Sequence, residues 1–244
     1  MHDTHLLVTC EHGGNRVPAR YRHLFAAHAA LLGTHRGYDP GALAFARDLA
    51  NRLAATCFVS TVSRLLVDLN RSIGHPKLYS EATRDAPPVL RREILDAHYL
   101  PYRNAVHAHI ADAVARGARV VHISSHSFTP VLDGVVRDAD IGLLYDPGRP
   151  GEAALCRHWQ AALAAALPEF RVRRNYPYTG KSDGLTAYLR RHYGANDYVG
   201  IEFEINQKHV RPASQWRGLR PAIIDALRAA LDAADPASAR AHRV

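Results

Sequence analysis

The stretch HLLVTCEHGG, from His5 to Gly14, decides the fold, because here an apolar run ends in a polar, glycine-rich turn. Residues 5–10 form a compact apolar segment, which predicts a buried β-strand. Gly13 and Gly14 allow the backbone to turn tightly beside His12, where a bulky residue would not. We therefore expect a first strand that delivers its loop, with His12, to a functional site.

Strand-like and helix-like patterns alternate along the rest of the chain. The predicted strands cover residues 56–60, 65–69, 120–124, 141–145 and 198–205. The predicted helices cover 40–54, with Asp39 as cap, 89–116, interrupted at Pro101, 152–167, 182–192, with Ser182 as cap, and 214–233. Residues 72–88, rich in proline, glycine and polar residues, predict a surface or active-site loop. This alternation predicts an α/β three-layer sandwich with a mostly parallel, mixed central sheet, helices on both faces and function at the carboxyl ends of its strands.

Length and cysteine usage limit the organisation of the chain. With 244 residues, 47% of them hydrophobic, one domain over residues 1–234 is the simplest expectation, followed by a polar, frayed tail over 235–244. Cys10, Cys57 and Cys156 are odd in number and widely separated. They predict neither a disulfide framework nor a cysteine-based zinc site.

The charge of the chain bears on its partners. A formal net charge of +8 is compatible with a polyanion, but the arginines are scattered and only three residues are lysines. No recognition helix or basic arm is present, so we expect a small anionic substrate and no nucleic acid. The N-terminus lacks a basic segment ahead of its short apolar run, and no apolar stretch approaches membrane-spanning length. We therefore expect no membrane association and a cytoplasmic location, and the sequence leaves the oligomeric state open.

Three metal-ligating residue types fall where the predicted sheet can bring them together. His12 follows the first strand, His126 follows the strand over 120–124, and Asp39 precedes a helix between them. Catalytic zinc sites use three such nitrogen or carboxylate ligands and keep one position open. Each residue also has a simpler interpretation, since Asp39 caps a helix equally well and a histidine in a turn is commonly a surface hydrogen-bonding group. Their combination favours a metal site.

Six ordered motifs make the chain resemble the N-formylglutamate amidohydrolase family over nearly its whole length. The motifs are VTCEHGGNRVP at 8–18, HRGYDPGA at 35–42, SRLLVDLNR at 63–71, HISSHSFTP at 122–130, NYPYTGKSDG at 175–184 and GIEFEINQ at 200–207. The family is similar to the zinc-exopeptidase or phosphorylase/hydrolase-like fold of carboxypeptidases and aspartoacylase. The resemblance implies a zinc-dependent enzyme that hydrolyses the amide bond of an N-acyl, most simply N-formyl, amino acid.

The resemblance also assigns candidate roles. It makes His12, Asp39 and His126 the zinc ligands, with Glu11 as the alternative carboxylate ligand. Glu202 and Glu204 lie on the same face of the last strand, and either can be the base that takes a proton from water, with Glu204 favoured.

A second group of residues is expected to bind the substrate. Asn70 and Arg71 stand where related enzymes grip a substrate carboxylate, which a planar guanidinium binds through two hydrogen bonds. Arg64 and Arg137 are further candidates, Asp68 is expected to orient Arg71 or a ligand, and Tyr176, Tyr178 and Lys181 can line the pocket. The competing hypotheses are a peptidoglycan or other amide hydrolase on the same metal frame and a non-catalytic binder of acidic metabolites.

Overall fold

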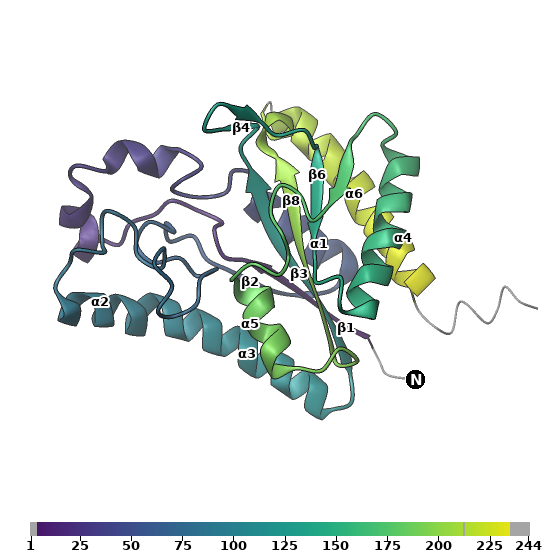
Figure 1. Ribbon diagram of the computed structural model, residues 1–244, viewed down its shortest axis with the longest axis horizontal. Helices are drawn as coiled ribbons and strands as arrows, with labels where there is room; N and C mark the ends of the chain where they lie inside the picture. Colours follow the sequence, from purple (N-terminus) through teal and green to yellow (C-terminus); the bar gives the residue numbers. More distant parts are fainter. Residues whose placement is uncertain (1–3, 212, 235–244) are drawn as a thin grey trace, which may run out of the picture.

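A six-stranded sheet runs through the computed structural model, which describes residues 4–211 and 213–234 (Figure 1). The strand order is β2-β1-β3-β8-β6-β7. The strands are β1 (Thr4–Cys10), β2 (Thr56–Val59), β3 (Arg119–Phe128), β6 (Ile141–Leu144), β7 (Val172–Arg174) and β8 (Tyr198–Asn206). The first four strands in this order are parallel to one another, whereas β6 is antiparallel to β8 and parallel to β7. The predicted α/β architecture with a mostly parallel, mixed sheet is confirmed.

Helices cover both faces of the sheet (Figure 1). One face packs against α1 (Ala42–Leu53), α4 (Pro150–Ala166) and α6 (Ala213–Ala234), and the other against α3 (Leu100–Ala115) and α5 (Leu185–His192). A separate apolar cluster lies under the short 3-10 helices η1 (Ala19–Phe25) and η2 (Ala29–Gly33), the helix α2 (Pro88–Ile94) and the π-helical segment η3 (Leu95–Tyr99). A small hairpin of β4 (Val131–Leu132) and β5 (Val135–Val136) follows β3, and the 3-10 helix η4 (Gln207–His209) follows β8.

Side-chain alternation sorts apolar from polar residues along the central strands. On β3, Val121 and Ile123 enter the core beneath α1, α4 and α6, which leaves His122, Ser124 and His126 on the opposite face. In the register of the sheet, Ser124 faces Glu202 and His126 faces Glu204 of β8. The polar residues therefore form a buried group on one face, near the carboxyl ends of the parallel strands.

Several expected elements differ from the structure. Residues 65–69 form turns instead of a strand, and β3 extends to Phe128, so His126 lies within the strand. The expected interruption near Pro101 is present, since α2 ends at Ile94, the π-helical η3 covers Leu95–Tyr99 and α3 begins at Leu100, directly before the proline that lacks an amide hydrogen. The strand β7 and the β4–β5 hairpin are too short to show a clear period in the sequence.

The two helix caps predicted from the sequence were wrong. Helix α1 begins at Ala42 after Gly41, which has a positive φ of 83°, and α5 begins at Leu185 after Gly184. Neither helix has a side-chain cap. The carboxylate of Asp39 is instead directed to two histidines, so its position before a helix has a different cause.

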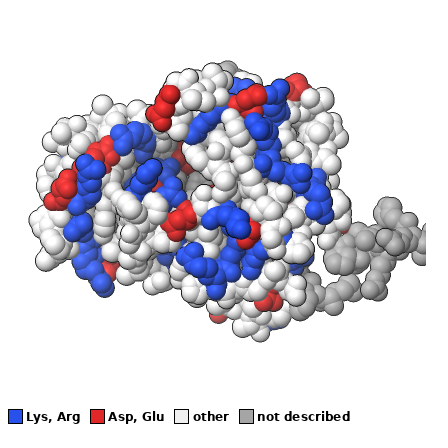
Figure 2. All heavy atoms as spheres, in the orientation of Figure 1, with Lys and Arg blue, Asp and Glu red and all other residues white. Residues whose placement is uncertain are grey.

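Charge is spread over the surface in several separate streaks. Figure 2 shows Lys and Arg side chains interleaved with acidic residues on the face it presents. All three cysteines are free, with Cys10 and Cys156 buried. Among the residues that the structure describes, no helix is long and apolar enough to span a membrane. The expected tail over residues 235–244 lies outside the described residues.

Candidate metal centre and active site

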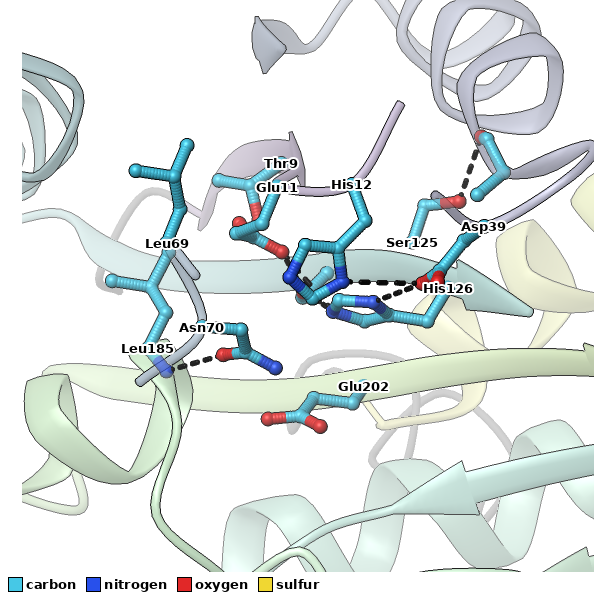
Figure 3. A network of polar contacts seen from close by, with 12 residues as sticks. Thr9, Glu11, His12, Asp39, Leu69, Asn70, Ser125, His126, Leu185 and Glu202 are labelled. Carbon is cyan, nitrogen blue, oxygen red and sulfur yellow. Dashed lines mark hydrogen bonds and ion pairs between the residues drawn. The ribbon is translucent and has the colours of Figure 1, made fainter. Parts of the chain in front are cut away.

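His12, Asp39 and His126 come together near the carboxyl ends of the inner strands β1 and β3, although they are far apart in the sequence (Figure 3). Asp39 Oδ2 lies 3.3 Å from His12 Nδ1 and 2.8 Å from His126 Nδ1. One ligand atom from each residue can be chosen so that all lie within 4.8 Å of one another, and all three residues are buried. His12 follows β1, His126 lies within the carboxyl-terminal part of β3, and Asp39 is brought in by the turn before α1, where its amide donates to the carbonyl of His12.

The spacing and the donor set fit a zinc ion. Two ligand atoms at about 2.0 Å from a tetrahedral zinc lie about 3.3 Å apart, which is close to the two separations around Asp39 Oδ2. Two imidazoles and one carboxylate are also the ligand types of many catalytic zinc sites. The three residues present therefore fit a metal of this kind.

The outer nitrogen of each imidazole contacts a further carboxylate. His12 Nε2 lies 2.7 Å from Asp68 Oδ1, and His126 Nε2 lies 3.1 Å from Glu11 Oε2. With Nε2–H donating to these carboxylates, each Nδ1 is free to direct a lone pair toward a metal. Asp68 thus contacts a candidate ligand, His12, and one of its two expected roles was to orient a ligand. Glu11 lies behind His126, outside the group formed by His12, Asp39 and His126.

The charges of these groups depend on one another. Burial opposes the ionisation of Asp39, but the contacts with His12 and His126 hold the pKa of this carboxyl well below its usual range. Burial likewise opposes a charged His126, but the hydrogen bonds to Asp39 and Glu11 raise the pKa of its imidazole well above the ordinary value. In the metal-free protein, the proton on His126 Nδ1 therefore takes the place that a cation would occupy.

Glu204 is an isolated carboxyl beside this cluster. Its side chain is buried, and its Oε2 has no hydrogen-bond partner within the described part of the chain. Burial raises the pKa of Glu204 to about 8, and the negative charges of Asp39 and Glu202 add to this effect while His126 opposes it. Glu202 is more exposed and accepts a hydrogen bond of 2.7 Å from Thr186. Of the two carboxyls, Glu202 is the one that a side-chain hydrogen bond holds among the described residues.

The four substrate-binding candidates differ in their contacts. Arg64 lies 2.7 Å from Asp68 and 3.4 Å from Asp39, so its guanidinium neutralises the carboxylates around His12. Arg71 donates to the carbonyl of Asp183, and Asn70 Oδ1 accepts from the amide of Leu185 at 2.6 Å (Figure 3). These bonds fix the loop after residue 69 against the start of α5.

Arg137 presents an unused hydrogen-bond donor. One of its terminal nitrogens donates to Tyr178 Oη at 2.8 Å, whereas Nη1 is buried without a partner among the described residues. Its guanidinium lies over the rings of Phe128 and Tyr178. Tyr178 is close enough to Glu204 and Arg64 for their charges to influence its pKa, which burial raises. Arg137 therefore contacts Tyr178 and keeps one buried donor without a partner within the described part of the chain.

Some of the residues around the site were not anticipated from the sequence. Thr9, Tyr102, His122 and Ser124 form hydrogen bonds behind the two histidines, and Thr186 holds Glu202. The polar residues at 122, 124 and 126 recur every second position along an otherwise apolar strand, and this period was the available signal. The hydroxyl of Tyr176 accepts a hydrogen bond from the amide of Asp138, which follows the β4–β5 hairpin. Within the described part of the chain, no hydrogen bond or ion pair joins Lys181 to the site.

The fold and the cluster define a class. An α/β sheet that gathers two histidines and a carboxylate beside an isolated buried glutamate is the arrangement of a candidate metal-dependent hydrolase. The model of the N-formylglutamate amidohydrolase family matches residues 4–210. The chain belongs to this family, whose members hydrolyse an amide bond.

Solved structures are similar to the chain over most of its length. A gene product from Agrobacterium tumefaciens is 30% identical with a TM-score of 0.81, covering 93% of this chain and 90% of that one. N-formylglutamate amidohydrolase from Ralstonia eutropha JMP134 is 19% identical with a TM-score of 0.69, covering 94% of each chain. No curated protein is significantly similar to the sequence.

Proposed function

We propose that this protein is a zinc-dependent amidohydrolase that cleaves an N-acyl amino acid, most simply an N-formyl amino acid such as N-formylglutamate. The observation that carries the proposal is the convergence of His12, Asp39 and His126 beside Glu204, whose Oε2 has no hydrogen-bond partner among the residues that the structure describes. Membership of the N-formylglutamate amidohydrolase family supports the amide as the bond that is broken.

His12, Asp39 and His126 would hold the zinc ion. When bound, zinc supplies a Lewis acid that makes a water molecule more acidic and polarises the amide carbonyl. Glu204 is the base that accepts the proton of the attacking water and then passes it to the leaving nitrogen. A positive charge beside Glu204 favours its ionised form, which a base requires.

Arginines bind the negatively charged substrate. Arg137, whose buried Nη1 has no partner among the described residues, is positioned to donate to a substrate carboxylate. Arg71 and Asn70, on the loop after residue 69, are the other candidates for binding it. Arg64 stabilises Asp39 and Asp68 and so supports the ligands. The burial of the cluster excludes bulk water, which strengthens each of these interactions.

The test is zinc-dependent hydrolysis by protein that has been stripped with a chelator and then reloaded with zinc. The substrates are N-formyl, N-acetyl and N-carbamoyl glutamate, the N-formyl derivatives of neutral amino acids, and a peptidoglycan fragment, with release of the free amine as the readout. We expect turnover of an N-acyl amino acid only in the zinc-loaded protein. Turnover of the peptidoglycan fragment alone would favour the competing amidase, and binding without turnover would favour a non-catalytic binder.

Two variants separate the roles. Glu204→Gln is expected to lower kcat by about 10²–10⁴-fold while zinc still binds in a 1:1 ratio, because the base contributes to proton transfer only. His126→Ala is expected to lose both zinc and activity. Full activity of His126→Ala on every substrate would contradict the proposal. Glu202→Gln is the matched control for Glu204→Gln, because it removes a neighbouring carboxylate.

A further inference from the structure

Glu11 is a fully buried carboxylate that no step of the proposed reaction uses. Its Oε1 accepts a hydrogen bond of 3.1 Å from Tyr102, which projects from α3, and its Oε2 accepts one of 2.7 Å from Ser124 on β3. Within residues 4–211 and 213–234, no lysine or arginine forms an ion pair with it. Among the same residues its one ion-pair partner is His126, whose Nε2 lies 3.1 Å from Oε2.

Glu11 and Asp39 lie on opposite sides of the His126 ring, as Figure 3 shows. Asp39 Oδ2 is 2.8 Å from Nδ1, and Nε2 is held between Glu11 and Ser124, whose Oγ is 2.9 Å away. An imidazole has two nitrogens that can exchange roles when the ring turns over. Contacts on both sides define which nitrogen faces His12 and Asp39.

We infer that Glu11 is a positioning residue for His126. The buried carboxylate of Glu11 fixes Nε2–H of the imidazole and so directs Nδ1 toward Asp39 and His12. This inference rests on the proposed zinc site. The ion pair with His126 and the hydrogen bonds from Tyr102 and Ser124 offset the cost of burying this charged carboxylate. The negative charge of Glu11, held at the His126 nitrogen that faces away from Asp39, adds to the attraction of the site for a cation.

Asp68 performs the corresponding task for His12, but in a different electrostatic setting. Asp68 is neutralised by Arg64 at 2.7 Å, whereas Glu11 is held only by hydroxyl groups and His126. The charge of Glu11 is therefore felt mainly by His126. Removal of that charge is expected to act more on metal affinity than on any other property of the site.

The experiment is zinc competition against a chromophoric chelator, together with the absorption spectrum of the cobalt-substituted protein. Glu11→Gln retains the shape of the side chain and removes its charge. We expect its zinc affinity to fall by about 10–100-fold, with a change in the cobalt ligand-field bands because His126 is held less firmly. Ser124→Ala, which leaves the charge but removes one of the two contacts of Oε2, is expected to show a smaller loss in the same direction.

Glu152→Gln is the matched control. Glu152 is equally buried, but its carboxylate is bound by Arg190 and by the amides of Asp146 and Gly200, and no histidine in the described ranges forms a hydrogen bond or ion pair with it. A merely structural role for Glu11 predicts that both Glu→Gln variants leave zinc affinity and the cobalt spectrum unchanged, even where they lower stability.

The outcomes are distinct. If Glu11→Gln binds zinc within twofold of the unchanged protein and gives the same cobalt spectrum, the inference is overturned while the proposed function stands. If the unchanged protein binds neither metal at this site, both fail. If Glu11→Gln does not fold, Ser124→Ala decides: zinc affinity and a cobalt spectrum identical to those of the unchanged protein would overturn the role of Glu11.

Discussion

At the scale of single residues, the site depends on the ionisation of groups that have been removed from water. Glu204 is the clearest case, because its pKa of about 8 lies above the value of 4.5 of the free side chain. A carboxyl of this kind couples the stability of the protein to pH. Its effect can be isolated in metal-free protein by comparison with Glu204→Gln.

Below pH 4.5, Glu204 is protonated in both the folded and the unfolded chain, and its ionisation costs no stability. Between pH 4.5 and 8 the unfolded chain releases the proton while the folded protein retains it, so the free energy of unfolding falls as pH rises. We expect Glu204→Gln to gain stability relative to the unchanged protein between pH 5 and 8.5, on the order of 1–4 kcal/mol. Urea unfolding of the two metal-free proteins at both pH values measures this, and parallel pH dependences would contradict it.

Arg137 provides a second prediction at the residue scale. Arg137→Lys keeps the positive charge but loses the planar fork of donors, so KM for an N-acyl amino acid should rise by about 10-fold or more with a smaller change in kcat. Arg173→Lys is the control, because Arg173 also stacks on a tyrosine, Tyr176, but is exposed. Steady-state kinetics in which both variants changed KM equally would remove Arg137 from substrate binding.

At the scale of elements, the approach of β6 to the loop over residues 175–184 depends on glycine. A Cβ on Gly142 would overlap the carbonyl oxygen of Tyr176 and touch the Cβ of Glu204. Gly142→Ala is therefore expected to destabilise the protein by about 1–3 kcal/mol, because a strand or loop must shift to admit the methyl group.

Gly218 in α6 is the matched control for that substitution. Nothing lies within 4 Å of a Cβ at Gly218, and alanine is more favourable than glycine in the interior of a helix. Gly218→Ala should thus stabilise the protein by about 0.5–1 kcal/mol in the same urea unfolding measurement. Destabilisation by both variants, to the same extent, would show that space at Gly142 is not the cause.

The sequence predicted the elements that carry an apolar run or a regular alternation, and it failed where the local pattern fits more than one structure. The strands at 4–10, 56–59, 119–128 and 198–206 carry apolar runs or alternation, and each was predicted within a few residues, apart from the carboxyl end of β3. Asp39 before a proline gave a standard capping signal, but the tertiary contact with two histidines overrode it. Residues 65–69 are as apolar as a strand because they enter a core of their own beneath α2 and η1.

The candidate site was predicted in part for the same reason. Sheet geometry could be expected to gather His12 and His126, since the sequence placed both after parallel strands, although His126 lies within β3. The partners of Glu11 and the free donor of Arg137 depend on the positions of α3 and of the β4–β5 hairpin. A linear sequence does not specify those positions, so these contacts became visible only in three dimensions.

At the scale of the whole molecule, a ligand that binds only the folded state stabilises it. Zinc at about 100 times its dissociation constant should add about 2.7 kcal/mol and raise Tm by roughly 5–10 °C for a chain of this size. Thermal unfolding in zinc and in chelator measures this effect. Asp39→Asn, which keeps the volume of the side chain, should abolish most of the shift, and an equal Tm of the unchanged protein in zinc and chelator would argue against a site formed on folding.

The sheet ends on one side at β7, a strand of three residues next to β6. Its short edge carries the exposed Arg173 and Arg174, and the carbonyl of Val172 is bonded by Gln160 of α4. Short strands and positive charges discourage an unpaired edge from adding strands of other molecules. The short strand and the two arginines therefore oppose aggregation through this edge of the sheet. We expect uncharged replacements of Arg173 and Arg174 to increase aggregation during refolding at high protein concentration.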